Sequence, residues 1–478
     1  MLLAGLANDG GLYVPTHWPK LAAPRSASGS YVERAVEVML PFVEPDLDEI
    51  TLTHLCAEAY ATFRHPATVP LVQIGEHQWV QELFHGPTLA FKDVALQLVG
   101  KMFDHVLAQR GERVTIVGAT SGDTGSAAID GVAGCDNVDI VILYPLGRTS
   151  DVQRRQMTTV DAPNAHAVAV EGTFDDCQDL VKAMFNDAEF RARNNLSAVN
   201  SINWARVMAQ TVYYVVAAET FAEPPTFVVP TGNFGNVLAG WIAREMGAPI
   251  HDFVLASNRN DILTRFVNDA DMSTRPVEPS LSPSMDIQVS SNFERLLFEM
   301  NGRDGGMTDE QLTRFRATGQ LEVEADQRAE FIDGSFRAAA FDDDATLAEI
   351  ARVQDTTGMI VEPHTACGTA AARLLAGPEG AQRPMVTLAT AHPAKFPDAV
   401  EQATGARPAL PAHLADLFER PERTQTVAND LAAVAALVEE LTRCAATATS
   451  TAAATASPRS LLRSRDCGRR AQVVEGPR

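Results

Sequence analysis

Lys92 is the residue whose type and surroundings best suit covalent chemistry. The 478-residue chain contains five lysines against 34 arginines, so arginine usually supplies its positive charge. Lys92 follows Phe91 and precedes the apolar residues Val94 and Ala95 by two and three positions. Apolar surroundings lower the pKa of an amine, which can then lose its proton and attack a carbonyl, whereas a guanidinium stays charged. A solvent-exposed lysine near a helix start is the alternative.

Two loops have the composition of anion-binding sites. Residues 232–236, with the sequence Gly-Asn-Phe-Gly-Asn, are expected to open a helix. Glycines permit close backbone approach, and a helix N-terminus favours an anion such as phosphate. Residues 120–124, Thr-Ser-Gly-Asp-Thr, offer hydroxyl groups suited to a carboxylate. A plain strand-to-helix turn or a helix cap is the alternative for each loop.

Apolar runs rich in β-branched residues alternate with helical patterns and must position these loops. This alternation predicts parallel sheets with helices on both faces, and such sheets bind ligands at the carboxyl ends of their strands. Both loops and Thr390 directly follow such runs, so we expect them to meet. The runs are residues 114–117, 138–144, 226–230 and 385–389.

The segment His85-Gly86-Pro87-Thr88-Leu89-Ala90-Phe91-Lys92-Asp93 resembles the pyridoxal-phosphate lysine segment of threonine synthases of the long bacterial and fungal type. The resemblance continues in the same order over roughly residues 5–435. It implies a fold-type-II α/β enzyme with two doubly wound, mostly parallel open sheets, flanking helices and a mainly helical N-terminal region. The other matching segments are residues 118–128, 200–207, 229–236, 282–295, 362–366 and 390–396.

The resemblance also implies which residues bind pyridoxal 5′-phosphate. Lys92 would bind the cofactor covalently and shuttle protons, residues 232–236 would hold its phosphate, and Thr390 would contact its pyridine nitrogen. Asp123 stands near the cofactor's 3′ oxygen, where relatives have an asparagine. The cofactor-binding residues are then Lys92, Gly232, Asn233, Phe234, Gly235, Asn236, Thr390 and Asp123.

Binding of a phosphorylated substrate needs further donors. The resemblance implies that Thr120, Ser121 and Thr124 face the substrate carboxylate. Arginine suits a leaving phosphate because its planar fork binds two oxygens. A structural ion pair is the alternative for each arginine. The candidates for the phosphate are Arg206 and Arg259, with Ser284 and Asn292 as polar support.

The implied activity converts O-phospho-L-homoserine and water to L-threonine and phosphate. A phospho-lyase or threonine dehydratase on the same scaffold, which would release 2-oxobutyrate, is the alternative. A catalytically silent binding protein would be expected to lack Lys92 or the loop at 232–236, and the chain has both.

The net charge of −22 argues against binding to nucleic acid or an anionic membrane. No run of 18 apolar residues and no secretory signal occur, and the six cysteines show no disulfide or zinc spacing, so we expect a cytoplasmic monomer or small homo-oligomer. No metal site is expected. The candidate histidines each lie in a turn beside proline or glycine, where we expect a hydrogen-bonded structural role; they are His85, His364 and His392. Lys395 is expected to form an ion pair or pack rather than act as a second Schiff-base lysine.

The chain divides into four predicted regions. Residues 1–75 form a mainly helical N-terminal region, and residues 76–215 form the domain that carries Lys92 and the substrate loop. Residues 216–444 form the domain that binds the cofactor phosphate, with a helical insertion near 305–345. Residues 445–478 are expected to be disordered. Family members typically have a further short segment before residue 6, so the sequence leaves open whether its start codon is mis-assigned.

Overall fold

The fold was analysed in a computed structural model that describes residues 2–3, 5, 7, 10–22, 29–376 and 383–442. The predicted disordered tail at 445–478 lies outside the described residues. Two helices lead the chain, α1 (Tyr31–Val43) and α2 (Glu49–Tyr60). Ser30 and Glu33 form a capping box at the start of α1, which satisfies backbone N–H groups that have no partner within the helix.

The smaller sheet has five strands in the order β13-β5-β4-β3-β6, and all neighbouring strands are parallel. Strand β4 is buried along its whole length, as expected for an apolar strand that helices cover on both faces. The strands are β3 (Val114–Ala119), β4 (Val138–Pro145), β5 (Ala165–Glu171), β6 (Leu196–Ser197) and β13 (Thr424–Ala428).

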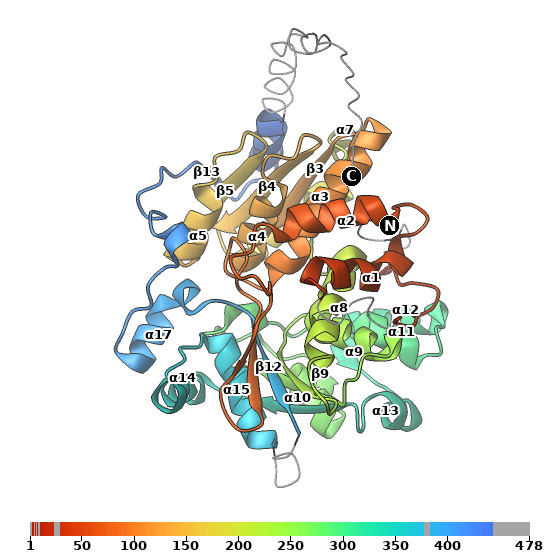
Figure 1. The fold of residues 1–478 in the computed structure, drawn as a ribbon. Helices are drawn as coiled ribbons and strands as arrows, with labels where there is room; N and C mark the ends of the chain where they lie inside the picture. The colour runs from red at the N-terminus through yellow and green to blue at the C-terminus, as the bar shows by residue number, and fades with distance from the viewer. Residues whose placement is uncertain are drawn as a thin grey trace, which may run out of the picture.

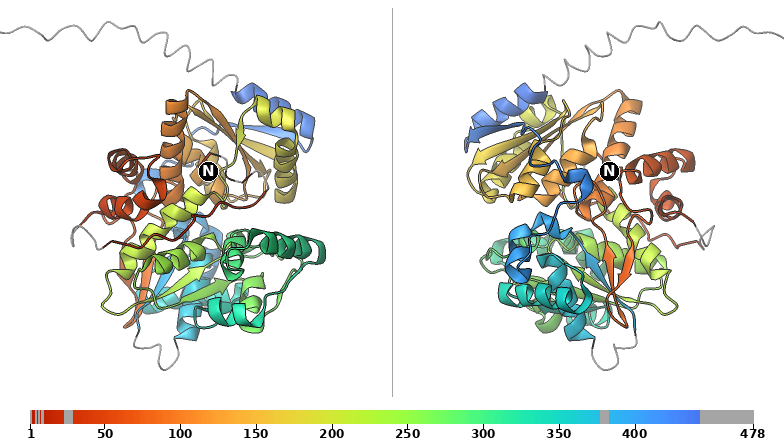
Figure 2. Two further views of the ribbon diagram at one scale, coloured as in Figure 1. Left: turned by 90° about the vertical axis from the view of Figure 1, so that its right-hand side faces the viewer. Right: turned by 60° about the vertical axis from the view of Figure 1, so that its left-hand side comes forward.

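The larger sheet has six strands in the order β1-β2-β12-β7-β8-β11, and only its edge pair β1 and β2 is antiparallel. Figures 1 and 2 show the two sheets as two halves of the molecule, each with flanking helices. The predicted class, two mostly parallel open sheets with a helical N-terminal region, is confirmed. The strands are β1 (Leu71–Gln73), β2 (Gln78–Glu82), β7 (Thr226–Pro230), β8 (Phe253–Ser257), β11 (Phe336–Ala340) and β12 (Met385–Ala389).

Two strands, β2 and β13, do not lie in the sheet that most of their neighbours in the sequence form. Strand β2 precedes Lys92 in the chain but pairs with β12 in the larger sheet, whereas β13, near the end of the described chain, pairs with β5 in the smaller one. The chain therefore crosses between the halves more often than a simple division predicts. The boundaries at 76, 216 and 445 stay predictions.

The predicted helical insertion near 305–345 differs from the structure at its end. Helices α12 (Gly305–Thr318) and α13 (Ala325–Phe331) are present, but Phe336–Ala340 is strand β11, which pairs in parallel with β8. The sequence Phe-Arg-Ala-Ala-Ala lacks β-branched residues, so only its packing against β8 makes it a strand.

Helices α3 (Lys92–Arg110) and α4 (Asp123–Val132) begin at two of the predicted site residues. The two helices approach each other so closely at Gly100 and Gly131 that a Cβ on Gly100 would overlap the carbonyl oxygen of Gly131. This contact between glycines fixes the relative positions of the two helix starts.

The remaining elements connect these strands. No helix of the described ranges is long and apolar enough to cross a membrane. The other α-helices include α5 (Asp151–Thr158), α6 (Phe174–Asn186), α7 (Ala188–Arg193), α8 (Trp204–Ala218), α9 (Gly235–Met246), α10 (Ile262–Asp269), α11 (Phe293–Met300), α14 (Asp343–Thr357), α15 (Pro363–Leu375) and α17 (Pro397–Thr404), and residues 431–442 are also helical. Short elements are β9 (Met272–Ser273), β10 (Gln320–Leu321), η1 (Pro283–Met285), η2 (Pro393–Lys395) and η3 (Ala412–Leu414).

Candidate active site

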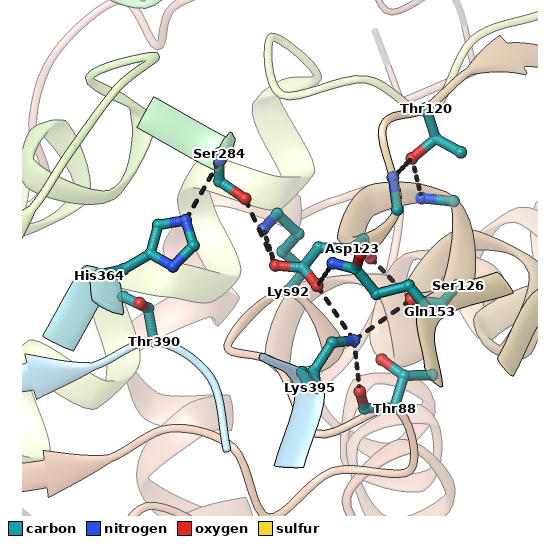
Figure 3. A network of polar contacts seen from close by, with 12 residues as sticks. Thr88, Lys92, Thr120, Asp123, Ser126, Gln153, Ser284, His364, Thr390 and Lys395 are labelled. Atoms are coloured by element: carbon teal, nitrogen blue, oxygen red, sulfur yellow. Dashed lines mark hydrogen bonds and ion pairs between the residues drawn. The ribbon is translucent and has the colours of Figure 1, made fainter. Parts of the chain in front are cut away.

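Lys92 is buried at the first position of α3, where the end of β12 holds the chain before it. The backbone N–H of Phe91 donates to the carbonyl oxygen of Thr390 at 2.8 Å, and the N–H of His392 donates to that of Leu89 at 3.0 Å. The Nζ of Lys92 lies 3.3 Å from Oδ2 of Asp123 (Figure 3). The structure thus brings Lys92, Asp123 and Thr390 together.

Burial, more than the surrounding charges, favours the neutral form of Lys92. Burial lowers the pKa of the Lys92 amine, the Asp123 carboxylate raises it in part, and the cations Lys395 and Arg206 lower it further. The net direction is downward from the ordinary lysine value. A primary amine in this state can act as a nucleophile and as a base.

Asp123 is a buried carboxylate at the centre of the cluster. Its Oδ1 accepts hydrogen bonds from Nε2 of Gln153 at 2.8 Å and lies 3.1 Å from the ammonium of Lys395. The hydroxyl of Ser284 donates to Oδ2 at 3.4 Å (Figure 3). Burial acts to raise the pKa of Asp123, but the positive charge of Lys395, and of Lys92 whenever it is protonated, outweighs burial and holds the pKa well below its ordinary value.

The loop at 120–124 forms the turn into α4. The Oγ1 of Thr120 accepts from the N–H groups of Gly122 at 3.0 Å and Gly125 at 2.9 Å, which is a capping role. Ser121 and Thr124 are half-buried on the same turn. The structure places all three beside Asp123, and their contact with a substrate carboxylate stays a prediction.

The loop at 232–236 joins β7 to α9, as predicted. Phe234 has a left-handed backbone with φ of 62°, an uncommon conformation for a residue other than glycine. A Cβ on Gly232 would lie 2.8 Å from the carbonyl oxygen of Ser284, and one on Gly235 would lie 3.0 Å from Nδ2 of Asn292. These glycines therefore let the loop pack against residues 284–292.

Asn236 presents an unused donor within this loop. Its Oδ1 accepts from the hydroxyl groups of Tyr213 at 2.5 Å and Tyr214 at 2.9 Å. Its Nδ2 is buried and has no hydrogen-bond partner among the described residues. The first N–H groups of α9 also have no acceptor earlier in the helix. This arrangement fits an anion bound at the start of α9.

Asn233, Phe234 and Asn292 contribute mainly through the backbone or through packing. The carbonyl oxygen of Asn233 accepts from the N–H of Asn292 at 3.1 Å, and the ring of Phe234 packs against Phe293. The side chain of Asn292 is buried between the carbonyl oxygen of Ser201, at 3.1 Å, and Nη1 of Arg295, at 2.6 Å. The side chain of Asn292 therefore supports the loop.

The structure separates the two candidate arginines. Arg206 is buried, its Nε has no partner among the described residues, and its Nη1 reaches only the carbonyl oxygen of Val199 at 3.5 Å. Burial lowers the pKa of Arg206 to about 10. The guanidinium of Arg259 instead lies 2.8 Å from Asp343 and 3.8 Å from Glu278. Of the two candidate arginines, Arg206 is therefore the one that has no acidic partner among the described residues.

Thr390 and Ser284 are linked through a carboxylate and an imidazole. The hydroxyl of Thr390 donates to Oε1 of Glu362 at 3.4 Å, and Oε2 of Glu362 lies 2.6 Å from Nδ1 of His364. Because Nε2 of His364 accepts from the N–H of Ser284 at 3.1 Å, the proton is on Nδ1 and the ring is neutral. This chain of contacts fixes the side chain that follows β12.

All three histidines that were expected to be structural make hydrogen bonds. The Nε2 of His85 lies 2.7 Å from Glu82, and Nδ1 of His392 accepts from the N–H of Ala394 at 3.1 Å. His364 contacts Glu362 as described. Within the described residues, no group of three or more histidine, cysteine or acidic side chains could hold a metal ion.

Lys395, Gln153 and Glu362 belong to the cluster but were not predicted as site residues. Lys395 was expected to form an ion pair, and the structure pairs it with Asp123. A second lysine within a segment that resembles the family, in a chain with five lysines, was the available signal. Glu362 also lies in a matching segment, residues 362–366, whereas Gln153 lies in none; only the fold brings Gln153 to Asp123 and Glu362 to Thr390.

Comparison with known proteins identifies the class to which this site belongs. Residues 65–391 match the family model described as pyridoxal-phosphate dependent enzyme. A buried amine of lowered pKa, an anion-binding loop and two parallel sheets are the features of that class. Residues 1–60 match the model for the threonine synthase N terminus, and residues 365–438 match the model for the threonine synthase C-terminal region. The chain therefore belongs to the threonine synthase family.

Individual relatives agree over most of the chain. Threonine synthase from Pseudomonas aeruginosa is 54% identical over 447 residues, which cover 92% of this chain and 95% of that protein. The structure of the PLP-bound threonine synthase from Brucella melitensis superposes with a TM-score of 0.89 at 50% identity, over 92% of this chain and 96% of that one. Yeast threonine synthase superposes with a TM-score of 0.86 at 37% identity, over 93% and 95%. The dehydratase alternative is not favoured.

Proposed function

We propose that this chain converts O-phospho-L-homoserine and water to L-threonine and phosphate, with Lys92 as the lysine that binds pyridoxal 5′-phosphate. One observation carries the assignment of roles. A buried amine with a lowered pKa and a buried guanidinium, which has no carboxylate partner among the residues described, act on each other electrostatically. Such a pair suits a reaction in which an amine moves protons and an anionic group departs.

The residues of the cluster fit the cofactor. Pyridoxal phosphate supplies an electron sink that stabilises negative charge on the substrate carbons. The unused Nδ2 of Asn236 and the N-terminus of α9 offer donors for its phosphate. The hydroxyl of Thr390 is available at the end of β12 for the pyridine nitrogen, and a neutral hydroxyl leaves that nitrogen less protonated than a carboxylate would.

Lys92 and Arg206 would share the work of the reaction. The Lys92 amine, when free, removes a proton from the substrate and returns one, because its lowered pKa lets it be neutral. Arg206 binds the phosphate of the substrate and stabilises the charge that forms as phosphate leaves. Arg259 is already paired with Asp343, so we assign it no such role.

The substrate carboxylate would lie at the turn of residues 120–124. Thr124 and Ser121 supply hydroxyl groups there, and Thr120 holds the turn through its bonds to Gly122 and Gly125. Ser284 contacts Asp123 from the larger-sheet half, so the substrate site would lie between the two halves. Closure of this site by both halves keeps bulk water from the reacting carbons.

We also propose that the enzyme works in the cytoplasm on a small molecule, as a monomer or small homo-oligomer that binds neither nucleic acid nor membrane. The cysteines within the described residues are free thiols, which suits a reducing compartment. The net charge of −22 opposes contact with polyanions. The free thiols are Cys56, Cys135, Cys177 and Cys367.

Replacement of Lys92 by alanine tests the assignment. Borohydride reduction of the parent enzyme should place the cofactor mass on the peptide that contains Lys92, as read by mass spectrometry, because the amine forms a reducible bond. Lys92→Ala should lose both this adduct and threonine formation. Lys101→Ala, a change in the same helix, should keep both. A cofactor adduct on another lysine in Lys92→Ala would contradict the assignment.

A further inference from the structure

Lys395 is a second lysine in the cluster, and its surroundings differ from those of Lys92. Its side chain is fully buried. Its Nζ donates to the carbonyl oxygen of Thr88 at 2.7 Å, to Oε1 of Gln156 at 2.9 Å and to Oγ of Ser126 at 3.5 Å. An ammonium has three N–H donors, and these three hydrogen bonds use them, while Oδ1 of Asp123 lies 3.1 Å away as the partner of an ion pair. Lys395 is therefore a fixed cation.

Lys92 has far fewer partners. Its Nζ reaches one hydrogen-bond acceptor among the described residues, Oδ2 of Asp123 at 3.3 Å, and lies over the ring of Phe91 at 4.8 Å. The amine can leave this single acceptor without leaving a network unsatisfied. One carboxylate thus stands between two lysines, of which one is fully bonded and the other is not.

The structure assigns Lys395 a positioning role: its ammonium neutralises and fixes Asp123, so that Lys92 is left as an available amine rather than as half of a buried ion pair. This inference rests on the proposed role of Lys92. A buried carboxylate without a fixed counter-ion would hold the Lys92 amine as an ammonium, because an isolated charge is costly away from water. With the ammonium of Lys395 as its counter-ion, Asp123 does not need Lys92 in the charged form.

The other charged groups around the pair act in known directions. Lys92 faces Asp123 on α4, Lys395 on η2 and Arg206 on α8, and the last two lower the pKa of its amine. Lys395 also faces Asp93, whose pKa it acts to lower. Loss of Lys395 therefore removes a like charge from Lys92 and leaves Asp123 to attract it, and both effects raise the Lys92 pKa.

The test is the pH dependence of Lys92 labelling in the full-length protein without cofactor. Trace acetic anhydride acylates the neutral amine only, and mass spectrometry reads the peptide that contains Lys92. In Lys395→Met, the midpoint of labelling should move up by about one pH unit or more. Lys182→Met, which removes an exposed lysine paired with Asp179, should leave the midpoint unchanged.

A double variant separates charge compensation from packing. Asp123→Asn in the Lys395→Met background removes both charges, so the Lys92 midpoint should return toward that of the parent. A purely structural role for Lys395 predicts no shift in Lys395→Met and no return in the double variant. Either result would overturn the proposal.

The parent protein gives a measurement that does not depend on whether Lys395→Met folds. Lys395 should resist acylation over the whole pH range in which circular dichroism shows folded protein, because its donors are all engaged. Acylation of Lys395 with the same midpoint as Lys92 would refute the fixed cation. Borohydride mapping of the holoenzyme separates a failure of the proposed function from a failure of this inference. An adduct on a lysine other than Lys92 refutes the proposed function. An adduct on Lys92, together with an unmoved labelling midpoint in Lys395→Met, refutes only the role of Lys395.

Discussion

At the scale of single residues, Arg206 carries the strongest claim about the substrate. Its guanidinium is buried, its Nε has no partner within the part of the chain that the structure describes, and its charge lowers the pKa of Lys92. Removal of this cation in Arg206→Leu should lower kcat/KM for O-phospho-L-homoserine by the equivalent of about 2 to 4 kcal/mol. Binding of unphosphorylated amino acids, followed by cofactor absorbance, should change little. Equal losses for phosphorylated and unphosphorylated ligands would indicate that the Arg206 side chain supports the fold instead. Arg259→Leu removes a partly exposed ion pair, so its effect on kcat/KM should be small.

Residue types revealed part of the cluster before the fold was considered. The segment around Lys92 predicted the amine, and the structure buries it as expected. For the two arginines the sequence left a choice, because the acidic partner of Arg259 is 84 residues away along the chain. The ion pair between Lys395 and Asp123 could not be predicted either, because the two residues are separated by 272 positions in the sequence. Contacts of this kind depend on the fold and leave no local pattern.

At the scale of elements, the contact between α3 and α4 sets the distance between Lys92 and Asp123. Gly100 and Gly131 lie eight residues after these two helix starts. A side chain on Gly100 would meet the backbone of α4, which cannot move aside as a flexible side chain can. Gly100→Ala should reduce the free energy of unfolding by about 3 kcal/mol and weaken cofactor retention on dialysis. In Gly305→Ala the new Cβ would meet no atom within 4 Å among the described residues beyond its chain neighbours and its own helix backbone, so this variant serves as the control in thermal denaturation. Equal thermal midpoints for the two variants would show that the helices can separate without cost.

Elements with strong local patterns were predictable from the sequence. The runs at 226–230 and 385–389 are strands β7 and β12 with the expected bounds. Strand β11 was missed because its alanine-rich sequence favours a helix, and pairing with β8 overrides that preference. The glycines at 232 and 235 were expected to give a ligand close access, but the structure shows that they also admit residues 284–292.

At the scale of the whole molecule, the cluster joins both halves of the fold. Lys92 and Asp123 begin helices on the smaller-sheet side, whereas Thr390 and Lys395 follow strand β12 of the larger sheet and Ser284 lies in η1. The family resemblance predicted this class of two-sheet enzyme. It did not predict the exchange of β2 and β13 between the sheets, since strand pairing over such sequence distances is decided by the packing of complete sheets.

The measurement that tests the central claim most directly is the product balance of the purified protein. With pyridoxal phosphate bound, the protein is given O-phospho-L-homoserine, and amino-acid analysis, a phosphate assay and an assay for 2-oxobutyrate follow the reaction together. We expect L-threonine and phosphate to appear in equal amounts, with no accumulation of 2-oxobutyrate. Release of phosphate with an equal amount of 2-oxobutyrate and no threonine would contradict the account, as would a failure to release phosphate at all.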